Sequence, residues 1–214
     1  MREYGRDGAE ISGIVLAGGR GSRLGADKRE VRILGMGLLD RAVALCAPVV
    51  ADLVIVAREP GEPRRGVPVI ADETPDRGPM AGLLTGLRHS RHRRALVIPV
   101  DMPLLTAEFL QFLVRASAGA EITVPRWDRG LEPLVGVYTR ACLEPLAEFV
   151  ASGATAVHAF VQSTTLPVRY VERAEVATFG PPERLFFNVN TPKDVAAAEA
   201  LLAGGVRPLR SEPP

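Results

Sequence analysis

The sequence lacks a surplus of charge of either sign. Its 214 residues include 26 basic and 25 acidic side chains, which gives a formal net charge of +1. A general nucleic-acid binder, or a protein that attaches to a charged membrane surface, would need an excess of one sign. No apolar run approaches the roughly 18 residues of a membrane-spanning helix, and residues 1–10 do not have the pattern of a secretory signal. We therefore expect a soluble, cytoplasmic protein whose partners include neither nucleic acid nor membrane.

Cysteine, histidine and aromatic residues are also scarce. Cys46 and Cys142 lie far apart inside apolar helical patterns, so we expect buried, reduced thiols rather than a disulfide. The three histidines lie outside every motif described below, and a zinc site would need more ligands. Aromatic residues make up 5% of the chain and hydrophobic residues 47%. The core must therefore rest on aliphatic side chains, which is typical of parallel strands covered by helices.

Two well-known phosphate-binding motifs are missing from the glycine-rich segment that follows residues 11–16, a predicted buried strand. A Walker loop would need Gly-Lys-Ser/Thr, and the dinucleotide fingerprint would need a third glycine at the position of Leu24. The loop contains Gly18 and Gly19, whose backbone can approach a ligand closely. It also carries three cations that suit phosphate, namely Arg20, Arg23 and Lys28. An ordinary strand-to-helix turn with solvated arginines would use the same residues.

Predicted strands and helices alternate along the chain. The strand patterns cover residues 11–16, 53–57, 67–70, 95–100, 122–124, 134–138, 166–171 and 186–190. The helical patterns cover residues 36–47, 78–90, 107–116, 141–152 and 192–203, and segments 59–66 and 125–133 are predicted to be irregular. This alternation is typical of βαβ units, so we predict an α/β fold with three layers: a Rossmann-like, mostly parallel sheet with helices on both faces. We expect one domain over residues 11–204, with flexible tails at residues 1–10 and 205–214.

Ligands in such sheets bind beyond the carboxyl ends of the strands. Asp101 follows one predicted strand and has no evident role as a helix cap, because Thr106 supplies that cap. A single carboxylate at a phosphate site suits Mg²⁺, which takes its other ligands from water and phosphate. Asp72 also follows a strand, where a ligand contact and a simple turn before Pro75 are equally consistent with the sequence.

Two further motifs fall on the same predicted edge of the sheet. Gly78 and Pro79 open a helix, whose N-terminus favours an anion, although Gly82 could equally serve helix packing. Asn188 and Asn190 share one face of the predicted strand 186–190. Thr191, with Asp194 three residues later, caps the next helix in a capping-box arrangement. Both asparagines are then available for a ligand.

These motifs together resemble those of a known family. Leu16-Ala17-Gly18-Gly19, with Ser22-Arg23-Leu24-Gly25 and Asp27-Lys28, resembles the signature loop of nucleotidyltransferases that activate small phosphorylated acceptors. The chain is most similar to the molybdenum cofactor guanylyltransferase family. Val100-Asp101-Met102-Pro103 matches the metal-binding Asp-x-Pro element of that family, and Phe187-Asn188-Val189-Asn190-Thr191-Pro192 matches its asparagine element. The matches occur in order between residue 11 and about residue 202.

The resemblance implies an activity and a set of site residues. The chain would transfer GMP from GTP to the terminal phosphate of molybdopterin, or of the molybdenum cofactor, and release pyrophosphate with Mg²⁺ as cofactor. The implied catalytic residues are Asp101, which holds the metal, Lys28 and Arg23. Nucleotide contacts would come from Leu16, Ala17, Gly18, Gly19, Lys28, Asp72 and Asp101. Acceptor contacts would come from Gly78, Pro79, Gly82, Asn188 and Asn190, and further partners would be other cofactor-synthesis enzymes or recipient molybdoenzymes.

Several departures from the family pattern keep alternatives open. Ala57-Arg58 stands where the family often has asparagine, and Glu132 stands where glutamine commonly precedes Pro-Leu. Ala17-Gly18-Gly19 favours guanylyl over cytidylyl transfer, because cytidylyltransferase relatives tend to have Ala-Ala-Gly. The alternatives are a cytidylyltransferase or a sugar-1-phosphate nucleotidyltransferase of the same fold, or a nucleotide-binding partner without catalytic activity.

Overall fold

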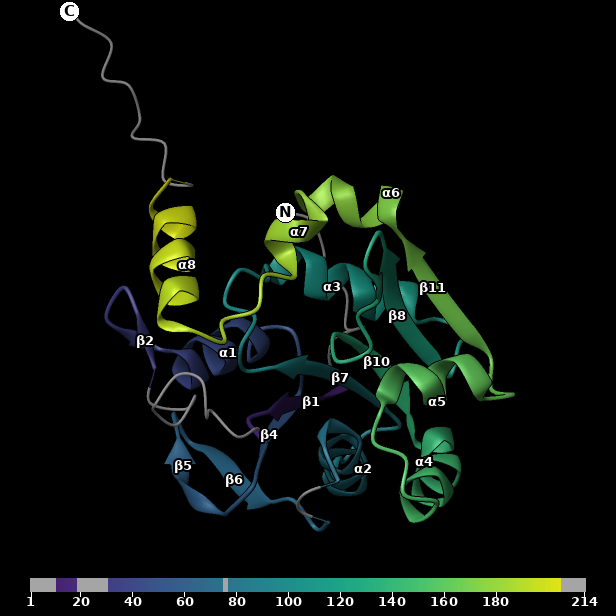
Figure 1. Ribbon diagram of the computed structural model, residues 1–214. Helices are drawn as coiled ribbons and strands as arrows, with labels where there is room; N and C mark the ends of the chain where they lie inside the picture. Colours follow the sequence, from purple (N-terminus) through teal and green to yellow (C-terminus); the bar gives the residue numbers. More distant parts are fainter. Residues whose placement is uncertain (1–10, 19–30, 75–76, 205–214) are drawn as a thin grey trace, which may run out of the picture.

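The computed structural model describes residues 11–18, 31–74 and 77–204 of the chain. Within these ranges, nine strands form one mixed sheet and helices cover both of its faces (Figure 1). Gly19, Arg20, Arg23 and Lys28 of the glycine-rich loop lie outside the described residues, and so do both predicted tails. None of the described helices is long and apolar enough to span a membrane.

The sheet has four parallel strands at its centre, and an antiparallel strand flanks them on each side. Its order is β11 (Val168–Glu172), β8 (Ile122–Trp127), β10 (Gly136–Thr139), β7 (Arg94–Pro99), β1 (Ile11–Leu16), β4 (Asp52–Ala57), β6 (Val67–Ala71) and β5 (Gly61–Arg64), and β9 (Gly130–Leu131) pairs with β8. Strands β7, β1, β4 and β6 run parallel to one another, as does β11 with β8. β10 and the edge strand β5 are antiparallel to their neighbours. The predicted mostly parallel α/β sheet is confirmed.

Strand β1 is buried along its whole length at the centre of the sheet. It pairs in parallel with β4 on one side and β7 on the other, and Leu16 lies opposite both Val56 and Pro99. Three neighbouring strands therefore end at the same level. The segments that follow them leave the sheet side by side, at its carboxyl edge.

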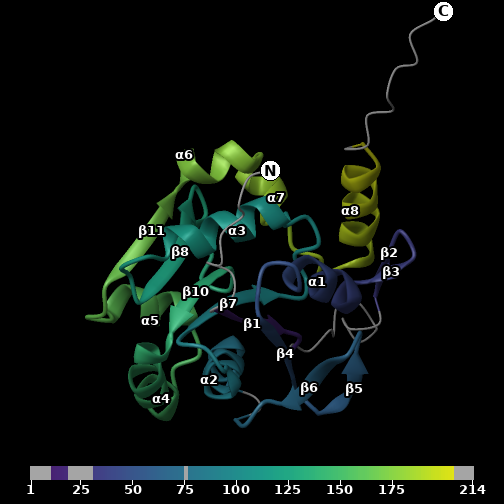
Figure 2. The same cartoon turned by 180° about the vertical axis from the view of Figure 1, so that it is seen from behind.

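Two helical layers cover the sheet. Side chains alternate between its faces, so Ile11 and Val15 of β1 belong to one hydrophobic cluster while Ile14 and Leu16 belong to the other. The first cluster contains α1 (Leu38–Cys46) and α3 (Ala107–Ala116). The second contains α2 (Pro79–His89), α4 (Leu143–Ala151) and α5 (Val157–Ser163). Figure 2 shows the same arrangement from behind, with α1 and α2 on opposite sides of β1 and β4.

The last long helix lies beside a small hairpin. α8 (Pro192–Gly204) contacts β2 (Arg32–Ile33), which pairs with β3 (Met36–Gly37), and the three elements are adjacent in both Figure 1 and Figure 2. The Leu34 N–H donates to Glu199 Oε1 over 2.9 Å and ties the hairpin to the helix. The predicted helix 36–47 therefore begins only at Leu38, because Met36 belongs to the hairpin.

Most predicted elements are present, and some local predictions are confirmed in detail. α3 has its predicted limits, and the Thr106 side chain caps it by accepting from the Phe109 N–H. Cys46 and Cys142 are buried free thiols, and burial raises the pKa of each to about 12. They are therefore poor nucleophiles near neutral pH.

Three local predictions are wrong. Residues 59–66 were expected to be irregular, but Gly61–Arg64 pairs as β5 with the edge strand β6. In the supposedly irregular 125–133, β8 continues to Trp127 and returns as β9. The strand expected at 186–190 does not form, because this segment follows the short helix α7 (Pro182–Leu185) and is held by buried Phe186 and Val189 rather than by a ladder. Helices α5, α6 (Arg173–Val176) and α7 were not predicted.

Substitution of Gly86 tests how closely α2 packs against the central strand β1. A Cβ atom at this position would lie 2.6 Å from Ile14 Cγ2, and Ile14 is fully buried. Overpacking costs about 1–3 kcal/mol and outweighs the helix propensity that alanine gains. We expect Gly86→Ala to lower the free energy of unfolding in urea by about 1–2 kcal/mol. Gly204→Ala is the control, because nothing lies within 4 Å of its Cβ position; an equal loss in both variants would contradict this description.

Candidate functional site

A pocket of about 490 Å³ opens at the carboxyl edge of the central parallel strands. Its lining comes from the ends of β1, β4, β6 and β7 and from the start of α2. Seven of the residues expected from the sequence line it: Leu16, Gly18, Asp72, Gly78, Pro79, Gly82 and Asp101. These residues come from positions 16 to 101 of the chain and meet because the strands that precede them are parallel and in register.

The first part of the glycine-rich loop remains attached to the sheet. The Ala17 N–H donates to the Val56 carbonyl over 2.8 Å, and the Leu16 carbonyl accepts from the Val100 N–H over 3.0 Å. Ala17 is buried and Gly18 is exposed at the pocket. Since the Ala17 N–H is already bonded, the first backbone that can turn to a ligand is that of Gly18. The expected contacts of Gly19, Arg23 and Lys28 lie outside the described residues.

Asp72 continues directly from β6. Its N–H donates to the Ala57 carbonyl over 2.7 Å, which extends the ladder between β4 and β6 by one bond. Its Oδ1 accepts from the Thr74 N–H over 3.0 Å and from the Thr85 hydroxyl over 3.2 Å. The carboxylate is therefore held in one orientation at the pocket wall.

The start of α2 presents backbone donors to the same pocket. Gly78 has φ of +70°, a conformation that side chains other than glycine rarely adopt, and Pro79 occupies the first turn. No side chain caps this helix end. Its first N–H groups and the helix dipole favour an anion. Gly82 lies one turn later, where a Cβ would come within 3.3 Å of Leu16 Cδ2, so glycine also keeps this wall of the pocket open.

Asp101 lies at the opposite wall, just after β7, and its side chain is half-buried. Its backbone carbonyl accepts from the Val189 N–H over 2.9 Å, which brings Asn188 and Asn190 next to it. Asn188 is exposed and Asn190 is half-buried, and neither lines the pocket. The two asparagines flank Val189, which is hydrogen-bonded to Asp101, and they lie on an irregular segment rather than on the expected strand.

The capping box after this segment is confirmed. The Asp194 carboxylate accepts from the N–H groups of Asn190 and Thr191, at 2.9 and 2.7 Å, and the Asp194 N–H donates to the Thr191 hydroxyl. These hydrogen bonds, the one from Asn190 first, hold the pKa of Asp194 below its ordinary value. The start of α8 thus fixes the backbone of the asparagine segment.

The pocket also contains residues that the motifs did not identify as site residues. Arg58, directly after β4, and Leu134 both line it. Glu132 lies near Leu134 and accepts from Trp127 Nε1 over 3.0 Å. Burial raises the pKa of Glu132, and the charge of Asp101 adds to the rise, while the Trp127 hydrogen bond and Arg129 oppose it. The sequence departs from the family pattern at Ala57-Arg58 and at Glu132, and these departures are the only sequence signal for Arg58 and Glu132.

The chemistry of the site fits Mg²⁺ better than a metal with an all-protein ligand set. Among the described residues, no three His, Cys, Asp or Glu side chains gather as a metal site. Asp101 provides one carboxylate at the rim of a pocket whose other wall suits anions. Mg²⁺ is commonly bound by one or two carboxylates together with water and phosphate oxygens.

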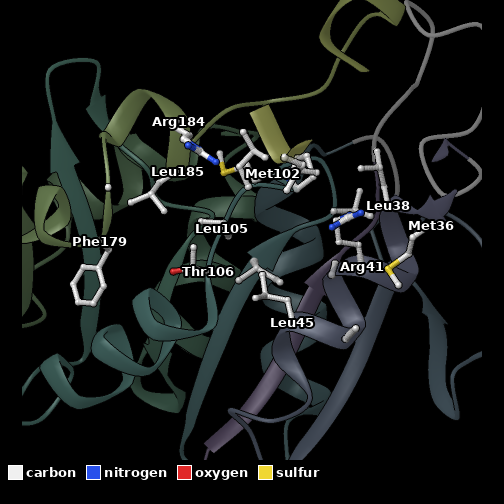
Figure 3. A pocket seen from close by; sticks show the side chains of 18 of the residues that line it. Met36, Leu38, Arg41, Leu45, Met102, Leu105, Thr106, Phe179, Arg184 and Leu185 are labelled. Atoms are coloured by element: carbon white, nitrogen blue, oxygen red, sulfur yellow. The ribbon is translucent and has the colours of Figure 1, made fainter. Parts of the chain in front are cut away.

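A second pocket, of about 510 Å³, lies on the α1 and α3 side of the loop that follows β7. Figure 3 shows mostly apolar side chains around it, among them Leu45, Met102 and Leu105, with Arg41 and Arg184 at its edge. Of the expected ligand-binding residues that the structure describes, none lines it. We therefore assign the candidate site to the pocket at the strand ends.

Known proteins resemble this chain over almost its whole length. The family model described as MobA-like NTP transferase domain matches residues 13–171. A probable molybdenum cofactor guanylyltransferase from Natronomonas pharaonis is 34% identical, over 91% of this chain and 99% of that protein. A molybdenum cofactor guanylyltransferase from Cereibacter sphaeroides is also 34% identical, over 90% and 97%. Among solved structures, molybdopterin-guanine dinucleotide biosynthesis protein A from Archaeoglobus fulgidus superposes with a TM-score of 0.76 at 26% identity, over 90% and 99%.

The raised pKa of Glu132 predicts a pH dependence of the free energy of unfolding. Because burial raises its pKa in the folded chain, ionised Glu132 is less favourable there than in the unfolded chain. Glu132→Gln removes this cost. At pH values below the ordinary pKa of 4.5, the variant and the parent should have the same free energy of unfolding. As the pH rises through the raised pKa, the variant should become more stable than the parent. Glu62→Gln is the control for the loss of one negative charge, because Glu62 is exposed on β5. A gain that does not depend on pH would contradict the assignment.

Proposed function

Because the chain belongs to the family of MobA-like NTP transferase domains, it is a nucleotidyltransferase, and we propose that it transfers GMP from GTP to the terminal phosphate of molybdopterin. The acceptor would be molybdopterin with or without bound molybdenum. Its phosphate oxygen would attack the α-phosphorus of GTP, form the new P–O bond and expel pyrophosphate. The observation that carries the proposal is the convergence of seven expected site residues on one pocket.

Charge and alignment are the main demands of this reaction. Both reactants are polyanions, so the protein must offset their repulsion and hold them in line. A phosphate monoester has a second pKa of about 6 and is already an anionic nucleophile at neutral pH. The reaction therefore needs no Ser-His-Asp or Cys-His arrangement.

The nucleotide would bind along the ends of β1 and β6. We assign the contacts with guanine or ribose to the backbone of Gly18 and Gly19, to the side chain of Leu16 at the pocket wall, and to the carboxylate of Asp72. The bonded N–H of Ala17 leaves that residue a role in shaping the loop. Lys28 and Arg23 would hold the departing pyrophosphate or the α-phosphate, because guanidinium and ammonium groups pair strongly with phosphate.

The acceptor would approach from the start of α2. The N–H groups that follow Gly78 and Pro79 belong to a helix end without a side-chain cap and suit the acceptor's phosphate, and Gly82 leaves room beside them. Asn188 and Asn190 would contact the acceptor from the rim next to Asp101. The Asp101 carboxylate would hold Mg²⁺, which when bound supplies positive charge to the phosphate oxygens.

Removing the Asp101 carboxylate tests the metal assignment. Asp101→Ala should lower Mg²⁺-dependent pyrophosphate release from GTP and molybdopterin by at least about 100-fold, since metal stabilisation of the phosphates is lost. Its melting temperature should stay close to that of the parent. Asp128→Ala removes an exposed carboxylate outside the pocket and serves as the control. A near-normal rate for Asp101→Ala would exclude Asp101 as the metal ligand.

Lys28→Ala tests the phosphate-binding role of the glycine-rich loop. The loss of one charge-assisted hydrogen bond should raise the KM for GTP by about 10-fold, with a smaller change in the KM for molybdopterin. Lys193→Ala is the matched control, because Lys193 is the only other lysine of the chain and is exposed on α8. Unchanged GTP kinetics in Lys28→Ala would show that the phosphates bind elsewhere.

A further inference from the structure

Thr85 is a buried polar residue whose hydroxyl faces the loop after β6. It is 1% exposed and lies in the middle of α2, one turn after Gly82. Residues three apart on a helix share a face. Gly82 and Thr85 therefore both point to Asp72, and Gly82 lines the candidate site.

The Thr85 hydroxyl makes two hydrogen bonds that fix its own orientation. Its oxygen accepts from the Glu73 N–H over 3.1 Å, and its O–H donates to Asp72 Oδ1 over 3.2 Å. The Thr74 N–H donates to the same Oδ1 over 3.0 Å. Both lone pairs of Oδ1 are therefore occupied within the protein.

The second carboxylate oxygen of Asp72, Oδ2, differs from Oδ1 in its surroundings. Among the described residues, no hydrogen bond reaches Oδ2, and a Cβ atom built at Gly82 would lie 3.8 Å from it. Oδ2 is thus turned toward the open wall of the pocket. A carboxylate oxygen only accepts hydrogen bonds, so its partner on a ligand must be a donor. A nucleoside offers such donors in its ribose hydroxyls and base N–H groups.

We propose that Thr85 is a positioning residue for nucleotide binding: it holds Asp72 Oδ1, so that Oδ2 alone accepts a hydrogen bond from a donor of the nucleoside. The proposal rests on the proposed function in taking a nucleoside triphosphate as the ligand. Thr85 itself does not touch the ligand. Its effect on affinity passes through the orientation of Asp72.

A purely structural role for Thr85 and a positioning role predict different effects of its substitution. The loop is held not only by the Glu73 N–H bond to Thr85 but also by the Asp72 N–H bond to Ala57 and by the ion pair between the Glu73 and Arg88 side chains. The additional bond from the Thr85 hydroxyl to Asp72 restrains a side chain that lines the pocket. Its loss should therefore change nucleotide affinity and KM more than kcat.

The test measures the dissociation constant of Mg·GTP by calorimetry without acceptor, together with KM and kcat for GTP. Thr85→Val keeps the shape but removes both hydrogen bonds, and we expect a dissociation constant about 10-fold higher. Thr85→Ser keeps the hydroxyl and should remain within about 2-fold of the parent. Thr123→Val is the matched control, because the Thr123 hydroxyl is buried in β8 and has no hydrogen-bond partner among the described residues. Parent-like affinity in Thr85→Val would overturn the proposal.

A double-mutant cycle separates positioning from general destabilisation. On an Asp72→Ala background, Thr85→Val should produce no further loss of affinity, since the group that it positions is gone. The same 10-fold loss on both backgrounds would overturn the proposal.

Asp72→Asn keeps the proposal testable if Thr85→Val does not fold. The Thr74 N–H selects the amide oxygen at the Oδ1 position, which places the NH₂ donor where Oδ2 was. We expect near-parental stability with at least about 10-fold weaker binding of Mg·GTP. Unchanged affinity would overturn the proposal.

Measuring which nucleotide the parent binds separates a failure of the Thr85 proposal from a failure of the proposed function. If the parent binds CTP, ATP or UTP instead of GTP, guanylyl transfer is wrong, and the same cycle with the bound nucleotide decides the role of Thr85. If the parent binds none of the four, both proposals are overturned.

Discussion

The site depends on the register of three parallel strands. Leu16 lies opposite both Val56 and Pro99, so β1, β4 and β7 end at one level in the middle of the sheet. Parallel strands must be joined by crossovers, so the segments that leave this edge come from distant parts of the chain. Asp72 and Asp101 reach opposite walls of one pocket for this reason. A slip of β1 against either neighbour would separate the two carboxylates and turn its side chains to the wrong layer.

The described walls of the pocket have complementary charge properties. The uncapped start of α2 favours an anion, whereas Asp101 favours a cation and Asp72 favours a hydrogen-bond donor. Glu132 is a further acidic group, and the charge of Asp101 contributes to its raised pKa after burial. Such a site suits a substrate that brings phosphates, a metal and a nucleoside together. Under the proposed function, the cations of the glycine-rich loop, Arg20, Arg23 and Lys28, would offset the charge of the two polyanionic reactants.

The sequence predicted the elements whose pattern is set by burial on both faces of the sheet. Strand β1 and the aspartates after β6 and β7 could be identified because aliphatic runs mark central parallel strands. The predicted strand at 186–190 does not form. The alternation of apolar Phe187 and Val189 with asparagines also occurs where an irregular segment buries its apolar side chains. The edge strand β5 was missed because its pairing depends on a neighbour rather than on its own composition. Thr85 could not be identified either, because a single threonine within a helix has no pattern that reveals its partner.

The most direct test of the account is Mg²⁺-dependent release of pyrophosphate from GTP, CTP, ATP and UTP, each with molybdopterin or a hexose 1-phosphate as acceptor. The account predicts release from GTP only, and only when molybdopterin is present. Release from CTP with molybdopterin would retain the fold and the site but contradict guanylyl transfer. Release with the hexose 1-phosphate would contradict the acceptor, and the absence of release from every pair would contradict the proposed reaction itself.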